Sequence, residues 1–279
     1  MKATVMDITP SMAKEMLTHN KVNRKLDRGR VAMYAADMKA GKWELNGEAI
    51  AFYVNRDLKD GQHRLNAIIE ADTPVKMLVV TDVPNESIIH DRGKIRTVAN
   101  VLDLAGYASL AKSTQGVGTV NFLFERLGPN ARPTDYQIQA FLDKYGDAVS
   151  TAVSVTRNGS NSPICRKAPI SSAAFCAMFN GVSQEKLLRF FKVANTGLAE
   201  SSLESSAVIL RNFIMAPSKY DSLAGSYGYY LRDRIFEVSL LAIHDYVESK
   251  PRTKMYSTRE STKYERFAKE NLFKGADEA

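Results

Sequence analysis

Apolar residues in the first part of the chain follow two different spacings. Short apolar runs at 4–8, 49–54 and 75–83 are typical of buried β-strands. Between these runs, apolar residues recur at i, i+3 and i+4, the spacing of one helical face, after Thr9 and again after Asp27. Both residues have side chains that cap helix starts, and Thr9 is followed by a proline, which suits a first helical turn. The first hundred residues therefore mix strands with helices.

The pattern changes after Gly106, where strand-like alternation disappears and helical spacing continues. Breaks rich in Gly, Pro and Asn separate the apolar-periodic stretches. We expect helices near residues 110–127, 135–145, 147–157, 170–180, 183–196, 205–216, 227–248 and 261–272. Segment 134–157 is the nearest candidate for a helix-turn-helix that reads DNA, although it lacks a clear polar recognition face. We therefore predict two domains, residues 1–106 and an all-α domain of residues 107–279.

Chemistry concentrates at the stretch Asp60-Gly61-Gln62-His63-Arg64, between a predicted strand and the next helix. Free backbone N–H groups at a helix start bind anions, and Gly61 has no Cβ to obstruct close approach. Arg64 offers a forked donor for phosphate or carboxylate, and Asp60 could cap the helix or hold a metal ion. The alternative is structural, with Asp60 as a cap, Arg64 as an ion-pair partner and His63 as a surface histidine. Five such residues in one turn favour a phosphate or nucleotide site.

This stretch resembles the DGQHR signature of the ParB/sulfiredoxin-like superfamily, and residues 5–105 resemble phage and prophage "ParB N-terminal domain" proteins. The other matching pieces are Ile8-Thr9-Pro10, Asn23-Arg24, Met38–Trp43, Asn46–Ile50 and Asp91–Thr97. The superfamily includes CTP-binding partition proteins, sulfiredoxins that use ATP, free-serine kinases and regulators of DNA modification. Sulfiredoxins carry a reactive cysteine where this chain has Gln62, which argues against sulfinic-acid reduction. For residues 1–106 the resemblance implies an α+β fold, a small mixed sheet with flanking helices.

The resemblance also implies a nucleoside triphosphate, ATP or CTP, with Mg²⁺ at this stretch. The residues that it assigns to nucleotide or phosphate binding are Gly61, Gln62, Arg64, Arg96 and Thr97. The residues that it assigns to catalysis are Asp60, His63 and Glu48, of which Asp60 and Glu48 would also hold the metal ion. Thr97 is expected to cap a helix over Val98–Leu104. Without the resemblance, Glu48 would be a solvated carboxylate and the segment around Arg96 a solvated basic loop.

Charge suggests a second partner. The chain has 279 residues, 44% of them hydrophobic and 25% charged, with a formal net charge of +7, a mild bias toward nucleic acid. Much of the excess lies in residues 250–274, where eight lysines or arginines face three glutamates. The candidate DNA contacts there are Lys250, Arg252, Lys254 and Arg259, in a basic end that also contains Tyr256 and Tyr264 and would contact nucleic acid without sequence preference. A solvated charged face explains the same pattern equally well.

Cysteine spacing and the lengths of the apolar runs suggest where in the cell the protein works. Cys165 and Cys176 lack metal-ligand spacing, so we expect two reduced structural thiols in the cytoplasm of a bacterial host. We expect no signal peptide and no membrane partner, because no run approaches the ~20 apolar residues of a membrane span. A homo-oligomer is compatible with the sequence.

The leading hypothesis is a phage or prophage nucleotide-binding protein that acts in DNA transactions, by NTP hydrolysis or phosphoryl transfer if turnover occurs. The first alternative is a non-enzymatic DNA-binding regulator or partition-like adaptor. The third hypothesis is a ParB-like nuclease, which would need a tighter carboxylate cluster than Asp60 and Glu48 supply.

Overall fold

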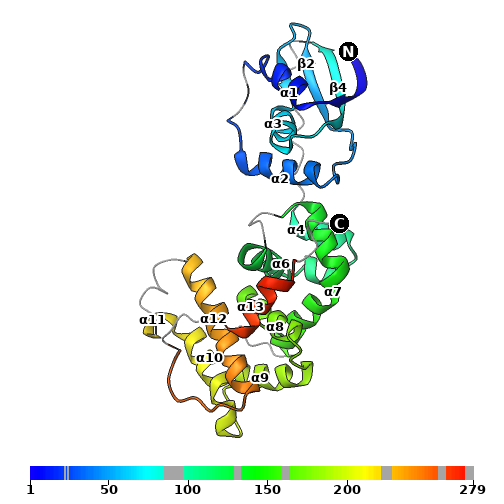
Figure 1. The fold of residues 1–279 in the computed structure, drawn as a ribbon. Helices are drawn as coiled ribbons and strands as arrows, with labels where there is room; N and C mark the ends of the chain where they lie inside the picture. The colour runs from blue at the N-terminus through cyan, green and yellow to red at the C-terminus, as the bar shows by residue number, and fades with distance from the viewer. Residues whose placement is uncertain are drawn as a thin grey trace. The chain divides into compact units, whose positions relative to one another are not determined.

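The chain has a mixed α+β fold in two compact units, one formed mainly by Met1–Ile95 and the other mainly by Arg96–Ala131 and Ile138–Lys274. The computed structural model describes residues 1–21, 23, 25–84, 97–128, 133–158, 164–220, 228–256 and 262–273. Each unit has its own hydrophobic core. Figure 1 shows the strands and helices of the first unit and the helices of the second. The predicted contrast between a mixed first part and a helical remainder is therefore present.

The first unit contains a four-stranded mixed sheet. Its strands are β1 (Lys2–Ile8), β2 (Ala49–Tyr53), β3 (Leu58–Asp60) and β4 (Val75–Val83), in the order β1-β4-β2-β3. β4 runs antiparallel to β1 and parallel to β2, and β2 runs antiparallel to β3. The three strands that apolar runs predict are confirmed, whereas β3 has only three residues and leaves no pattern in the sequence.

Three helices pack with this sheet, namely α1 (Pro10–Leu17), α2 (Arg28–Lys39) and α3 (Gln62–Ala71) (Figure 1). The predicted caps are confirmed, since the Thr9 side chain accepts a hydrogen bond from the Met12 N–H and Asp27 accepts one from the Arg30 N–H, both at 3.2 Å. The helices and the sheet share one core, whose largest buried side chains are Ile8, Ile50, Leu58, Leu65, Ile68 and Met77. This core fixes the turn between β3 and α3.

From Thr97 onward, all the secondary structure that the structure describes is helical. Its longer helices are α4 (Val98–Leu104), α6 (Thr114–Leu127), α7 (Asp135–Arg157), α8 (Ala168–Phe179), α9 (Gln184–Thr196), α10 (Ser205–Met215), α12 (Gly228–Val247) and α13 (Lys263–Asn271). The short ones are α5 (Ala108–Ala111), α11 (Pro217–Tyr220) and a 3₁₀ turn at Ser202–Glu204. Most predicted helices recur within about two residues, a normal uncertainty for helix ends.

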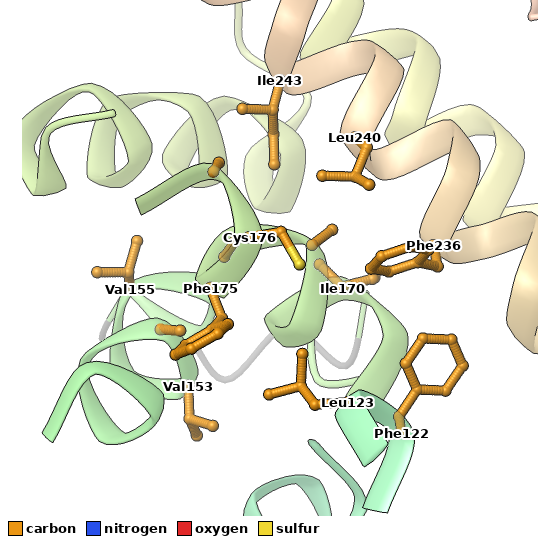
Figure 2. Packing of buried hydrophobic residues seen from close by; sticks show 14 of the residues in the cluster. Phe122, Leu123, Val153, Val155, Ile170, Phe175, Cys176, Phe236, Leu240 and Ile243 are labelled. Atoms are coloured by element: carbon orange, nitrogen blue, oxygen red, sulfur yellow. The ribbon is translucent and has the colours of Figure 1, made fainter. Parts of the chain in front are cut away.

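The core of the second unit surrounds α8. Figure 2 shows Ile170, Phe175 and Cys176 of α8 among side chains of α6, α7 and α12. Cys165 and Cys176 are buried, free thiols, as expected. Burial raises the pKa of the Cys165 thiol to about 12 and the pKa of Cys176 still further, so both stay protonated near neutral pH.

The helix-turn-helix prediction for residues 134–157 is wrong, because α7 is one uninterrupted helix of 23 residues. Gly146, which the prediction takes as a break, lies inside α7. A Cβ at Gly146 would lie 2.2 Å from Cζ of Tyr107, so this glycine makes room for the Tyr107 ring instead of making a turn. The predicted helix at 110–127 is likewise corrected, since Ser113 caps α6 and separates it from α5.

Candidate functional site

The motif residues lie where β3 ends and α3 begins. Asp60 is the last residue of β3, and Gly61 stands before α3 with φ 109°, a backbone conformation that L side chains rarely adopt. A Cβ on Gly61 would also lie 3.1 Å from Cα of Ile50. Asp60 Oδ1 accepts a hydrogen bond from the Gly61 N–H at 2.7 Å, and no side chain in the described chain caps α3 at Gly61. The start of α3 therefore keeps its anion-attracting N–H groups without a side-chain cap.

Arg64 lies beneath two exposed carboxylates. Its side chain is only 10% exposed, and its Nη2 donates to the Ala49 carbonyl oxygen at 2.6 Å. Its guanidinium also contacts Glu48 at 3.3 Å and Asp60 at 3.4 Å, whose side chains are 65% and 57% exposed. Among the described residues, the buried Nε of Arg64 has no hydrogen-bond partner. The structure thus brings together three of the predicted site residues around one cation.

Gln62 and His63 face the interior of the first unit. Both are buried, and His63 Nε2 accepts a hydrogen bond from the Asp27 N–H at 3.0 Å. Gln62 Oε1 accepts one from Asn20 Nδ2 at 3.3 Å, and Asn23 Nδ2 donates to the Leu58 carbonyl at 2.9 Å. These bonds tie the segment between α1 and α2 to the β3–α3 turn. The surface-histidine interpretation is therefore wrong, because His63 is a buried contact whose Nε2 lone pair is occupied.

The second predicted anion site falls mostly outside the described residues, which do not include Arg96. Thr97 caps α4 as predicted, accepting from the Asn100 N–H at 3.4 Å while the Asn100 side chain accepts from the Thr97 N–H at 2.9 Å. Thr97 belongs to the second unit.

The four predicted DNA contacts near the C-terminus do not share one environment. Arg252 contacts Asp245 at 3.4 Å and lies over the Tyr256 ring, 4.2 Å from its centroid. Lys250 and Lys254 are exposed, and Arg259 lies outside the described residues. Tyr256 and Tyr264 are buried in the core of the second unit, so their rings are not exposed for contact with nucleic acid. Their apolar contacts with distant helices, which residue spacing does not reveal, place them there.

Sequence reasoning missed the Ala49 carbonyl as the anchor of Arg64, and Asn20 and Asn23 as supports of the turn. The signal for Ala49 was present but incomplete, because Glu48 precedes β2 and Asp60 ends β3. Once β2 and β3 pair antiparallel, with Ala51 opposite Asp60, both carboxylates come to the same edge of the sheet.

No protein-family model, no curated protein and no solved structure matches this chain. Across the described ranges, no three His, Cys, Asp or Glu side chains gather where they could hold a metal ion. None of the helices in the described part of the chain is long and apolar enough to cross a membrane.

Proposed function

We propose that the first unit is a nucleotide-binding module of the ParB/sulfiredoxin-like type and that the chain acts in DNA transactions of a phage or prophage. One observation carries this proposal: a buried arginine, with an unpartnered Nε in the described structure, stands at a helix start that lacks a side-chain cap. An arginine beside a helix start without a side-chain cap is the kind of site that binds phosphate.

The backbone geometry supports a phosphate over the start of α3. Gly61 lets the chain turn closely against Ile50, which a residue with a Cβ would disturb. The bond from Arg64 to the Ala49 carbonyl fixes the guanidinium before any ligand arrives. A preorganised donor costs less conformational entropy on binding.

The two carboxylates fit a magnesium ion that arrives with the nucleotide. Mg²⁺ in nucleotide sites usually takes one or two carboxylates and completes its shell with phosphate oxygens and water, so Glu48 and Asp60 suffice in number. When bound, such an ion neutralises phosphate charge and orients the phosphate chain. Glu48 and Asp60 would exchange Arg64 for the metal ion, which would leave the guanidinium available to the phosphates.

If turnover occurs, we propose hydrolysis or phosphoryl transfer with Asp60 or Glu48 as the base. Both carboxylates are exposed enough to reach a water molecule or a hydroxyl group. His63 is less suited to this role through Nε2, because that atom already accepts a hydrogen bond from the Asp27 backbone. Charge stabilisation by Arg64 would then supply most of the rate enhancement.

A second candidate function is a non-enzymatic DNA-binding regulator or partition-like adaptor. The observation that favours it is that Gln62, His63 and Arg64 all contact parts of their own unit. The motif would then hold the fold, and exposed lysines such as Lys250 and Lys254 would contact DNA phosphates. DNA binding by this route should weaken steeply with salt and after Lys250→Gln/Lys254→Gln.

The deciding experiment measures the melting temperature of the full chain with ATP, CTP, GTP or UTP, each with Mg²⁺ or with a chelator. A ligand at ~100 times its Kd stabilises the native state by roughly 2.7 kcal/mol. We expect one nucleotide to raise the melting temperature in a Mg²⁺-dependent way, and Glu48→Gln/Asp60→Asn to abolish that dependence. Glu70→Gln, at an exposed position late in α3, is the matched control and should behave as wild type. No shift with any of the four nucleotides would contradict the proposal and favour the DNA-binding candidate.

A further inference from the structure

A cavity of about 480 Å³ opens in the first unit between α1 and one corner of the sheet. Its volume lies in the range of small-molecule sites. The walls come from α1, from Lys2 of β1, from the ends of β2 and β4, and from the turn that contains Arg56. None of the residues that the resemblance assigns to a nucleotide lines it.

The cavity and the β3–α3 turn lie at opposite ends of β2. Arg64 binds the carbonyl of Ala49, the first residue of β2, whereas Phe52 and Tyr53, the last two residues, line the cavity. A ligand in the cavity would therefore be independent of a nucleotide at Gly61.

One wall of the cavity suits a flat aromatic ring. Met12 and Met16 lie one turn apart on α1, so both side chains come from the same helical face. Phe52 meets the His19 ring edge-on, with centroids 6.4 Å apart and planes at 87°. Thioethers and aromatic edges make favourable contacts with an aromatic ring, and methionine adapts its shape to the ligand.

The rest of the cavity carries two positive and two negative side chains, Lys2, Arg56, Glu15 and Asp82. None of these four forms an ion pair with any residue in the described ranges. Within the described residues, the Asp82 side chain accepts a single long hydrogen bond, 3.4 Å, from the Thr81 hydroxyl. A ligand with one positive and one negative group would find a partner for each, whereas a phosphate would meet two carboxylates.

Two of these charged residues have a strained backbone, Arg56 in the turn after β2 and Asp82 near the end of β4. Arg56 has φ 69° and Asp82 has φ 59°, both in the left-handed region that favours glycine. The chain thus has long or charged side chains where glycine would relieve strain. Such outliers occur at ligand sites, where the side chain is needed at that place.

We propose that this cavity binds a small aromatic zwitterion, of the chemical class of the aromatic amino acids. The ring would lie against Met12, Met16 and Phe52. The ligand carboxylate would pair with Arg56, assisted by Lys2, and the ligand ammonium group with Asp82, assisted by Glu15.

Isothermal titration calorimetry on the full chain tests this, with L-phenylalanine and L-tryptophan as the probes. Phenylacetate, which lacks the ammonium group, and phenethylamine, which lacks the carboxylate, complete the set. We expect both amino acids to bind and each half-ligand to bind about tenfold more weakly or worse, the loss expected for a missing charged hydrogen bond.

The strained positions supply variants that should stay folded. Arg56→Gly should weaken the binding of L-phenylalanine about tenfold and leave the binding of phenethylamine unchanged. Asp82→Gly should weaken the binding of L-phenylalanine and leave the binding of phenylacetate unchanged. Asp72→Gly, with φ 49° at an exposed position outside the cavity, is the matched control and should change nothing. All three should melt at or above the wild-type temperature, because glycine relieves backbone strain.

Two results would overturn the proposal. One is no heat of binding for either amino acid at millimolar concentration. The other is binding that neither Arg56→Gly nor Asp82→Gly alters, which would place the ligand elsewhere. Neither result depends on whether nucleotides bind at Gly61.

Discussion

Arg64 in the first unit and Arg126 in the second each face several carboxylates, yet the two clusters differ in what surrounds the acids. Arg126 of α6 contacts Asp233 at 3.6 Å and Glu237 at 3.4 Å on α12, and Glu265 at 2.8 Å on α13. The side chains of Glu237 and Glu265 are 13% and 9% exposed. The partners of Arg64 are mostly exposed instead. Buried acids need their arginine, whereas exposed acids can return to water.

The comparison separates a structural ion cluster from one that a ligand can rearrange. Removing one partner of a buried pair leaves an uncompensated charge, which is strongly destabilising. An exposed carboxylate loses little when its partner leaves, because water replaces the partner. The Arg64 cluster can therefore exchange partners at low cost, which a binding site requires.

The largest effect is expected for Arg126→Met, because it leaves Glu265 buried without its cation and leaves Glu237 with Arg234 alone. We expect the free energy of unfolding to fall by about 3 kcal/mol, measured by urea denaturation. Arg126→Met/Glu265→Gln should recover part of that loss. A fall below about 1 kcal/mol, the usual value of an exposed pair, would show that the two clusters are energetically alike.

Gly61→Ala should come next, at about 2 kcal/mol, because alanine is strained at φ 109° and its Cβ would press on Ile50. Gly47→Ala is the control, since Gly47 has φ 82° but no atom within 4 Å of the added Cβ. The difference between the two unfolding free energies reports the Ile50 contact together with the different backbone strain at φ 109° and φ 82°. Equal losses would mean that the turn tolerates a side chain and that only backbone strain matters.

Arg64→Met should lower the free energy of unfolding by about 1–2 kcal/mol, the cost of losing the partly buried hydrogen bond to the Ala49 carbonyl. Chemical denaturation beside Arg126→Met provides the comparison. If Arg64→Met lowered the free energy of unfolding more than Arg126→Met, the main role of Arg64 would be structural.

The smallest effect is expected for Lys263→Gln, which removes a 2.6 Å ion pair with Glu248 between exposed side chains. Pairs of this kind contribute about 0–1 kcal/mol, so the unfolding curve should hardly move. The same measurement in high salt should reduce any difference further, because salt screens exposed charges.

Much of the fold was predictable where local chemistry decides it. Apolar spacing predicted β1, β2 and β4, and the caps Thr9, Asp27 and Thr97 predicted helix starts. β3 was missed because a strand of three residues is too short to show an alternation of apolar and polar residues. Gly146 misled the prediction because a glycine that makes room for a ring looks, in sequence, like one that makes a turn.

The candidate site was predictable as a location and less so as an arrangement. The motif indicated that Asp60 and Arg64 lie at a strand–helix junction, as they do. The burial of Arg64 and its bond to Ala49 depend on how β2 pairs with β3, which no local pattern encodes. The interior positions of Tyr256 and Tyr264 depend in the same way on distant helices.

The strand order β1-β4-β2-β3 also determines the order in which the strands can pair while the chain is being synthesised. β4 is the last strand to be made, yet it pairs with both β1 and β2. Only the β2–β3 hairpin can form while the ribosome has yet to release Val83. β1 must therefore remain unpaired within its own sheet until the 66 residues between Ile8 and its partner Val75 have been made, and the β3–α3 turn gains its full core only after β4 has joined the sheet.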